Sequence, residues 1–228
     1  MKMKKKIFAI FLCTSLLMGC SSTDVVKTEN TATKQEAKKE ELVNTVACKV
    51  VDTYDEAKVA STVQKLEKRA KIYSATAKIT ANKQDSTVTI ELPDIKTNEE
   101  VQSIVKDITG VGAITFDDEQ HKTLLTSKSI KEATVSPVSN TATSTEANYA
   151  VTFKFNEDGA KKFATITKNN LGKQIALCCD QATILKATVS TVIVDGNIML
   201  DGFTTKQEVE SIVAKVQDGG LDVKLEVQ

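Results

Sequence analysis

Residues 88–116 read VTIELPDIKTNEEVQSIVKDITGVGAITF, and this stretch decides the fold of the first half of the chain. Val88–Leu92 alternates apolar and polar side chains, as a half-buried strand does, and Pro93 ends it. Thr97-Asn98-Glu99-Glu100 is a capping-box pattern that opens a helix with a single apolar stripe. Glycines at 110 and 112 end this helix, and Ala113–Phe116 predicts another strand.

The residues before this stretch supply the first half of a larger pattern. They predict a strand, a helix and a second strand at Val46–Val51, Asp55–Ile72 and Ala77–Thr80. Residues 46–118 therefore predict the order β-α-β-β-α-β, a ferredoxin-like base. Because each helix is apolar on one side only, both helices are expected to cover one face of an antiparallel sheet.

Residues 119–228 predict a second α+β module, the head, so that the fold class is an α+β base followed by an α+β head. The predicted strands are Tyr149–Phe155, Ile175–Cys179 and Ile184–Val189, and helices follow Asn156 and Thr205. Val192–Leu200 predicts a hairpin because Asp195-Gly196 suits a type I′ turn. The final alternating segment, 221–228, is expected either to stay in the head or to return to the base sheet.

Residues 1–19 are organised as a lipoprotein signal peptide. Four lysines precede the apolar run Ile7–Met18, which is too short to span ~30 Å of hydrocarbon. The run ends in Leu17-Met18-Gly19-Cys20, which resembles a bacterial lipobox. That resemblance implies cleavage after Gly19 and a diacylglycerol on the Cys20 thiol, and two acyl chains suffice for stable anchoring. The alternative is an ordinary signal peptide followed by an incidental cysteine.

The charge of the chain is divided unevenly between signal and mature protein. The 228 residues hold 30 Lys and Arg against 30 Asp and Glu, a balance that excludes a polybasic nucleic-acid-binding protein. Without residues 1–19 the count is 26 against 30, a net charge of −4. Residues 20–45 are rich in Ser, Thr, Lys and Glu, and they predict a lipid-anchored flexible tether.

Neither the cysteines nor the single histidine predicts a catalytic or metal site. Cys48, Cys178 and Cys179 lack the spacing of metal ligands. Cys178 and Cys179 are expected to be two small buried hydrophobes, and a disulfide from Cys48 to one of them is left open. His121 is the only histidine, which disfavours Ser-His and Cys-His catalysis. The acids before it are typical of a solvated turn. We therefore expect a protein that is not an enzyme and that holds no cofactor and no metal.

Two ordered sets of residues resemble a known family. In the head these are Phe155-Asn156-Glu157-Asp158-Gly159-Ala160, Leu171-Gly172-Lys173-Gln174 and Gly219-Gly220-Leu221-Asp222-Val223. In the base, Ile90-Glu91-Leu92-Pro93-Asp94 fits as well. Over about residues 50–228 the chain resembles the first extracytoplasmic domain, base plus head, of the SecD and SecDF protein-export subunits.

The resemblance implies a noncatalytic binding module on the extracytoplasmic face of the cell membrane. We expect a stand-alone, lipid-anchored protein without the family's transmembrane part, whose partners are exported polypeptide or the Sec translocon. Gln181 stands where the family favours glycine, and Lys186-Ala187-Thr188 replaces a Ser-Ala-Pro stretch. Gln181, Lys186 and Thr188 are therefore our candidates for polypeptide-contact loops. The alternative is a repurposed envelope lipoprotein that binds another ligand or self-assembles and has no export role.

Overall fold

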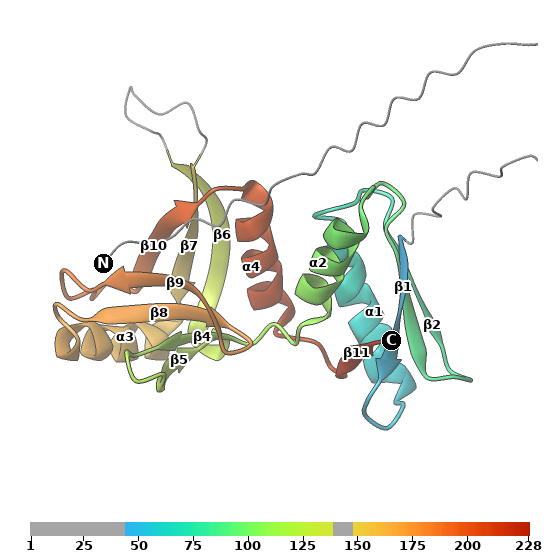
Figure 1. The fold of residues 1–228 in the computed structure, drawn as a ribbon. Helices are drawn as coiled ribbons and strands as arrows, with labels where there is room; N and C mark the ends of the chain where they lie inside the picture. The colour runs from blue at the N-terminus through green and yellow to red at the C-terminus, as the bar shows by residue number, and fades with distance from the viewer. Residues whose placement is uncertain (1–43, 139–147) are drawn as a thin grey trace, which may run out of the picture. The chain divides into compact units, whose positions relative to one another are not determined.

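The computed structural model describes residues 44–138 and 148–228. The predicted signal peptide, the lipid-attachment residue Cys20 and all but the last two residues of the predicted tether lie outside these ranges. Within them the chain forms four α-helices and three antiparallel sheets (Figure 1). The predicted α+β fold class is confirmed.

The base is a four-stranded antiparallel sheet with two helices on one face. The strand order is β11-β1-β3-β2. Its elements are β1 (Thr45–Val50), α1 (Glu56–Ala70), β2 (Lys78–Asn82), β3 (Thr87–Glu91), α2 (Asn98–Thr109) and β11 (Leu225–Val227). The helices begin where side chains cap them: Asp55 accepts a hydrogen bond from the Lys58 amide, and Thr97 accepts one from the Glu100 amide.

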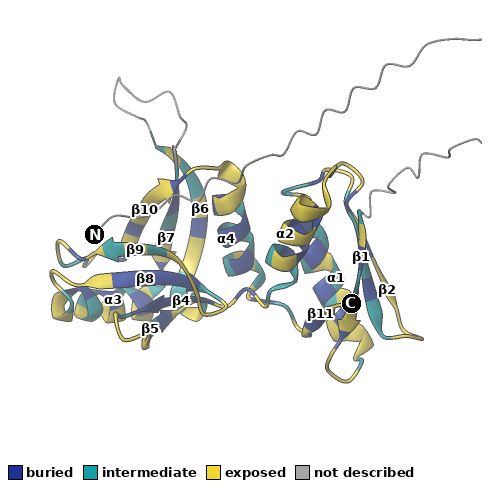
Figure 2. Cartoon of the chain, viewed as in Figure 1, coloured by how far each residue is buried: buried dark blue, intermediate teal, exposed yellow. Residues whose placement is uncertain are grey.

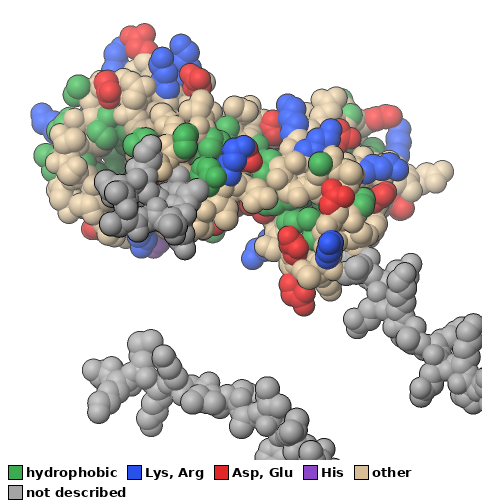
Figure 3. All heavy atoms as spheres, turned by 90° about the horizontal axis from the view of Figure 1, so that it is seen from above, with side chains coloured by type: hydrophobic (Ala, Val, Ile, Leu, Met, Phe, Trp, Pro, Cys, Tyr) green, Lys and Arg blue, Asp and Glu red, His purple; other side chains and the backbone are tan. Residues whose placement is uncertain are grey.

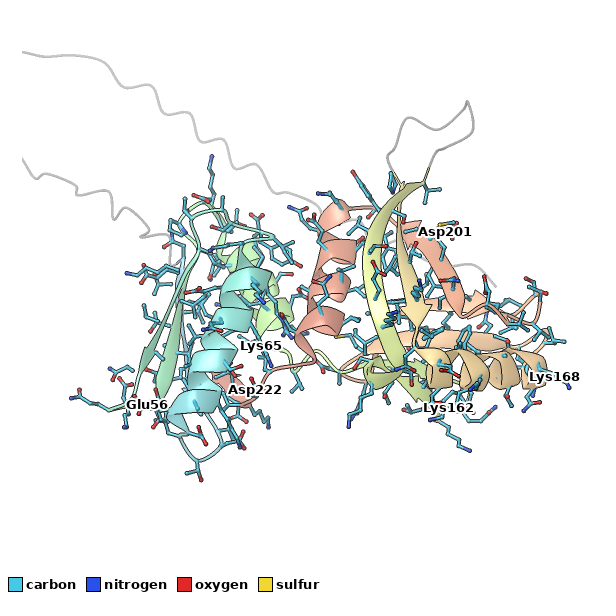
Figure 4. All side chains as sticks on the ribbon, turned by 180° about the vertical axis from the view of Figure 1, so that it is seen from behind. Glu56, Lys65, Lys162, Lys168, Asp201 and Asp222 are labelled. Atoms are coloured by element: carbon cyan, nitrogen blue, oxygen red, sulfur yellow. The ribbon has the colours of Figure 1, made fainter. Side chains whose placement is uncertain are left out.

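The last strand of the base sheet is not the one that the sequence predicts. The predicted strand forms as β4 (Ile114–Asp117), but it pairs with β8 of the head, and β11 pairs with β1 instead. Residues 114–117 therefore lie in a head sheet, and the C-terminal segment supplies the outer strand β11 of the base sheet. The C-terminal segment is held on α1, where Lys65 Nζ lies 2.9 Å from a carboxylate oxygen of Asp222 (Figure 4).

The head consists of two further sheets, ordered β10-β7-β6 and β5-β4-β8-β9. Besides β4, its strands are β5 (Thr123–Thr126), β6 (Ile130–Val138), β7 (Asn148–Phe155), β8 (Gln174–Cys179), β9 (Ala182–Thr188) and β10 (Asn197–Phe203). Its helices are α3 (Glu157–Asn169) and α4 (Lys206–Asp218), with a short 3₁₀ turn at Ser127–Ser129. Helix α4 begins with a complete capping box between Thr205 and Glu208.

The predicted hairpin at 192–200 does not form. Residues 192–194 are irregular, and β10 begins at Asn197 and pairs with β7. Gly196 does adopt the expected left-handed conformation, with φ 70°. Asp195 does not share this conformation, so the type I′ turn does not form, and β10 pairs with the earlier strand β7.

The three described cysteines are free thiols, so no disulfide joins Cys48 to the other two. Cys48 is fully buried in the base core, and burial raises the pKa of its thiol to about 11. Cys178 and Cys179 lie on β8 in the head. Cys178 and Cys179 pack as ordinary small hydrophobic side chains.

Candidate functional site: an uncharged groove between two strand edges

The strands β9 and β10 lie at the edges of the two head sheets. Strand β9 pairs only with β8, and β10 pairs only with β7, within the part of the chain that the structure describes. Figure 2 shows the mostly exposed β9 beside the deeply buried β8. Each strand therefore presents one row of backbone N–H and C=O groups without a neighbouring strand.

A tight turn positions β9. Asp180 and Gln181 have φ values of 49° and 70°, so both central residues of the β8–β9 turn are left-handed, as in a type I′ turn. The Asp180 carboxylate also accepts hydrogen bonds from the amides of Gly112 and Ala113, at 3.0 and 2.9 Å. The turn is thereby fixed to the segment that enters β4.

A groove of about 290 Å³ opens between β9 and β10. Half-buried Leu185 and Ala187 line it from β9, and Ile198, Met199 and Leu200 line it from β10. The remaining lining residues come from the core and from the β9–β10 connection, among them Phe116, Phe163, Leu177 and Ile193. No lining residue is charged.

The phenylalanines of the head form the floor against which these strands pack. The ring of Phe116 lies edge-on to Phe153, Phe155 and Phe163, with centroid separations of 5.7, 5.7 and 5.8 Å. Such edge-to-face pairs add about 0.5–1.5 kcal/mol each beyond the area they bury. The floor is thus rigid and apolar, while Met199 at the rim is 60% exposed.

The structure does not bring the three sequence-predicted contact residues into one site. Gln181 is in the β8–β9 turn, but Lys186 and Thr188 are on strand β9 and not in a loop. Of the three, only Thr188 lines the groove; Lys186 lines a separate hollow with Asp118 and Glu119. The sequence analysis missed Leu185 and Met199, because their position on edges depends on which strands pair.

A second, polar cluster lies between α2 and α4. Asp107 accepts hydrogen bonds from Tyr73, Ser211 and Lys215 at 2.8, 2.7 and 2.6 Å. Burial alone would raise the pKa of Asp107, but the charge of Lys215 and these three hydrogen bonds outweigh it and lower the pKa below its ordinary value. Asp107 is therefore held as an anion that joins two helices, which is a structural role and not that of a general acid.

A buried arginine reinforces the same junction. Arg69 is only 1% exposed, and it donates hydrogen bonds to the carbonyls of Ile108 and Gly110 at 3.1 and 2.8 Å. Its desolvation lowers the guanidinium pKa, and nearby Asp218 and Asp107 oppose that shift. The α2–α4 contact thus rests on buried charges, unlike the uncharged groove.

Known proteins resemble the sequence and the fold of this region. Residues 112–223 match the model of the SecDF P1 head subdomain. The chain is 30% identical over 173 residues to the protein translocase subunit SecD of Acidaminococcus fermentans, which covers 76% of this chain and 39% of that protein. It is 29% identical over 140 residues to SecD of Dictyoglomus turgidum, or 61% of this chain and 33% of that protein. The chain thus spans well under half the length of these relatives.

Solved structures agree on the fold. A chain from the structure of "a membrane component SecDF that enhances protein export" superposes with a TM-score of 0.55 at 18% identity, covering 80% of this chain and 97% of that one. SecDF in a super-membrane-facing form gives 0.57, again at 18% identity, over 80% of this chain and 29% of that one. The head is therefore similar in sequence to the SecDF P1 head subdomain and to SecD, and its fold resembles that of SecDF. Among the described residues, no helix has the length and hydropathy that a membrane span requires.

Proposed function

We propose that this chain is a lipid-anchored, extracytoplasmic binding module that assists protein export by contacting translocating polypeptide. The groove between β9 and β10 carries the proposal. It is mostly apolar, uncharged and open at a rim where Met199 is 60% exposed. Exposed apolar surface of this kind is what an unfolded chain can bind, because its own apolar side chains are not yet buried.

The surfaces of the head and the base support different roles for these two regions. In the view of Figure 3, hydrophobic side chains are exposed on the head, whereas Lys, Arg, Asp and Glu side chains cover much of the base. In the head, Leu171, Ile184, Val194 and Met199 are the large apolar residues with the most exposed side chains. We therefore assign polypeptide contact to the head and propose that the base supports the head.

The membrane attachment is part of the proposal and has its own test. Diacylation of Cys20, followed by the polar segment 20–45, would hold the head near the membrane surface. We expect Cys20→Ser to move the protein from the membrane fraction to the soluble extracytoplasmic fraction. A protein that stays in the membrane fraction after this change would contradict the lipid anchor.

Photocrosslinking in cells tests the contact itself. A photoreactive amino acid at Met199 should form adducts with pulse-labelled precursors that still carry their signal peptides, or with Sec subunits. Val51 of the base, 45% exposed, is the matched control position and should give none. Equal yields from the two positions, or no precursor and no Sec adduct from Met199, would contradict the proposal.

A second candidate function is self-assembly or binding of another envelope ligand, without an export role. The two open strand edges favour it, because an edge strand can pair with another chain of any origin. Normal secretion in a deletion strain, together with a specific partner outside the Sec machinery, would favour this candidate over the first.

A further inference from the structure

The edges β9 and β10 carry few of the charges and none of the prolines that protect edge strands, although each contains a register shift. Strand β9 has seven residues and one charge, Lys186, and β10 has seven residues and one charge, Asp201, which is exposed (Figure 4). The opposite edge of the β10-β7-β6 sheet is β6, which carries Lys131, Glu132 and Pro137. Charges and proline discourage pairing with a further strand. Of the two edges of the β10-β7-β6 sheet, the less protected one therefore borders the groove.

The side chains of β9 alternate across that edge. Leu185 and Ala187 line the groove, while Lys186 between them lines a different hollow. An extended chain that pairs with β9 would alternate in the same way, so every second side chain would enter the groove. Seven residues at ~3.3 Å each give a paired length of about 23 Å.

The two edges converge at one end of the groove. A side-chain carbon placed on Gly202 of β10 would lie 3.6 Å from Leu185 Cδ1 of β9. Gly202 also sits at a register shift of β10, with φ 103°. Along the rest of the groove, Leu200 and Met199 form the wall opposite β9.

We propose that the groove binds one extended, uncharged segment of unfolded polypeptide by strand addition to β9, with alternate apolar side chains in the cavity. The inference rests on the proposed function and names its mode of recognition. Main-chain hydrogen bonds supply affinity that is independent of sequence, and the uncharged lining selects apolar side chains. Such a site suits many client sequences.

The geometry favours this occupant over two others. The groove is about twice the ~150 Å³ of an apolar cavity that holds a benzene-sized molecule, and it is open between two edges, so a small ligand would leave it partly unfilled. A second copy pairing through β9 would bring two Lys186 side chains onto one face of the joint sheet. Like charges so placed destabilise strand pairing.

Peptide binding to the full 228-residue chain tests the inference. The probe is a fluorescent nonapeptide of alternating Thr and Leu, and its control is the same peptide with every second amide N-methylated. Methylation removes donors from one edge but keeps the side chains, so we expect affinity to fall at least about tenfold. Equal binding of both peptides would overturn strand addition while leaving polypeptide contact intact. Binding of neither would overturn both.

A pair of neighbouring substitutions locates the site. Leu185→Glu places a charge in the groove and should weaken binding of the parent peptide by about tenfold or more, whereas Lys186→Glu on the opposite face should change it less than about threefold. Circular dichroism and the Tm establish that both variants fold, and Met199→Glu replaces Leu185→Glu if the latter does not. Two results would overturn the proposal. One is equal peptide affinity of the Leu185→Glu and Lys186→Glu variants; the other is a concentration-dependent dimer that Leu185→Glu abolishes, without any peptide binding.

Discussion

The buried core of the base contains no aromatic side chain among the described residues, whereas five phenylalanines fill the core of the head. The base takes its last strand from the far end of the chain, while the head places the edge strands β9 and β10 on the two sides of one groove. Large rings packed edge to edge hold two separate sheets together without requiring that their edges meet. The base is thus packed with aliphatic side chains, and the aromatic core of the head lies beneath the groove.

The largest effect is expected from a substitution in the aromatic core of the head. Phe116 is 2% exposed and touches three other rings. Phe116→Ala should lower the free energy of unfolding by about 3–5 kcal/mol, the usual loss for a buried phenylalanine. Urea denaturation followed by circular dichroism measures the change. Val194→Ala, at a position 75% exposed, is the control and should stay within about 0.5 kcal/mol of the parent.

The next largest effect is expected from a substitution in β11, the C-terminal strand of the base sheet. Leu225 is buried in the base core, so Leu225→Asp should cost about 2–4 kcal/mol because a carboxylate would be desolvated there. The thiol of Cys48, whose residue pairs with Val227 across the β1–β11 ladder, should then react faster with a maleimide. Its native pKa of about 11 would fall toward the ordinary 9.0 as the sheet edge loosens.

Val227→Asp is the matched control for this change. Val227 lies on the same strand but is 46% exposed, so the added carboxylate stays in water. We expect a change of less than about 1 kcal/mol and unaltered Cys48 labelling. Equal effects of the two substitutions would argue against β11 as a strand of the base sheet.

Local signals in the sequence predicted most of the elements but not which strands pair. Helices α1, α2 and α4 follow from apolar periodicity and from the caps at Asp55, Thr97 and Thr205. The four residues of β4 do not indicate which sheet they join. The pairing of Phe116 with Leu177 places β4 in a head sheet. A strand's place at an edge depends on its neighbours, so the groove could not be found from the sequence. Likewise, Asp107 meets Lys215 across 108 positions of chain.

The contact between α2 and α4 gives a smaller effect that depends on pH. Asp107→Asn keeps the shape of the side chain but leaves Lys215, whose side chain is 6% exposed, without its counter-ion. Loss of one partner of a fully buried pair costs about 3–5 kcal/mol; because the Asp107 side chain is 35% exposed, we expect about 2–3 kcal/mol at pH 7. A double-mutant cycle with Lys215→Met should give a coupling above about 1 kcal/mol.

The sign of the pH dependence follows from the pKa of Asp107. Because folding lowers this pKa, the carboxylate contributes stability that is fully present above its unfolded value of 3.8. That contribution disappears as the pH falls through the lower native pKa. The difference between parent and Asp107→Asn should therefore persist from pH 7 to about 5 and shrink below about 4. A difference that grows on acidification would contradict the assigned pairing.

The smallest expected effect is a gain at the turn that leads into β9. Gln181 has φ 70°, a conformation that disfavours a side chain, and a glycine at this position would relieve that strain while adding conformational freedom to the unfolded chain. We expect Gln181→Gly to raise the free energy of unfolding by about 0.5 kcal/mol. The same variant separates two readings of this residue. Unchanged binding of the alternating Thr-Leu peptide would show that Gln181 only shapes the turn, whereas weaker binding despite higher stability would identify its side chain as a polypeptide contact and extend the site beyond the groove.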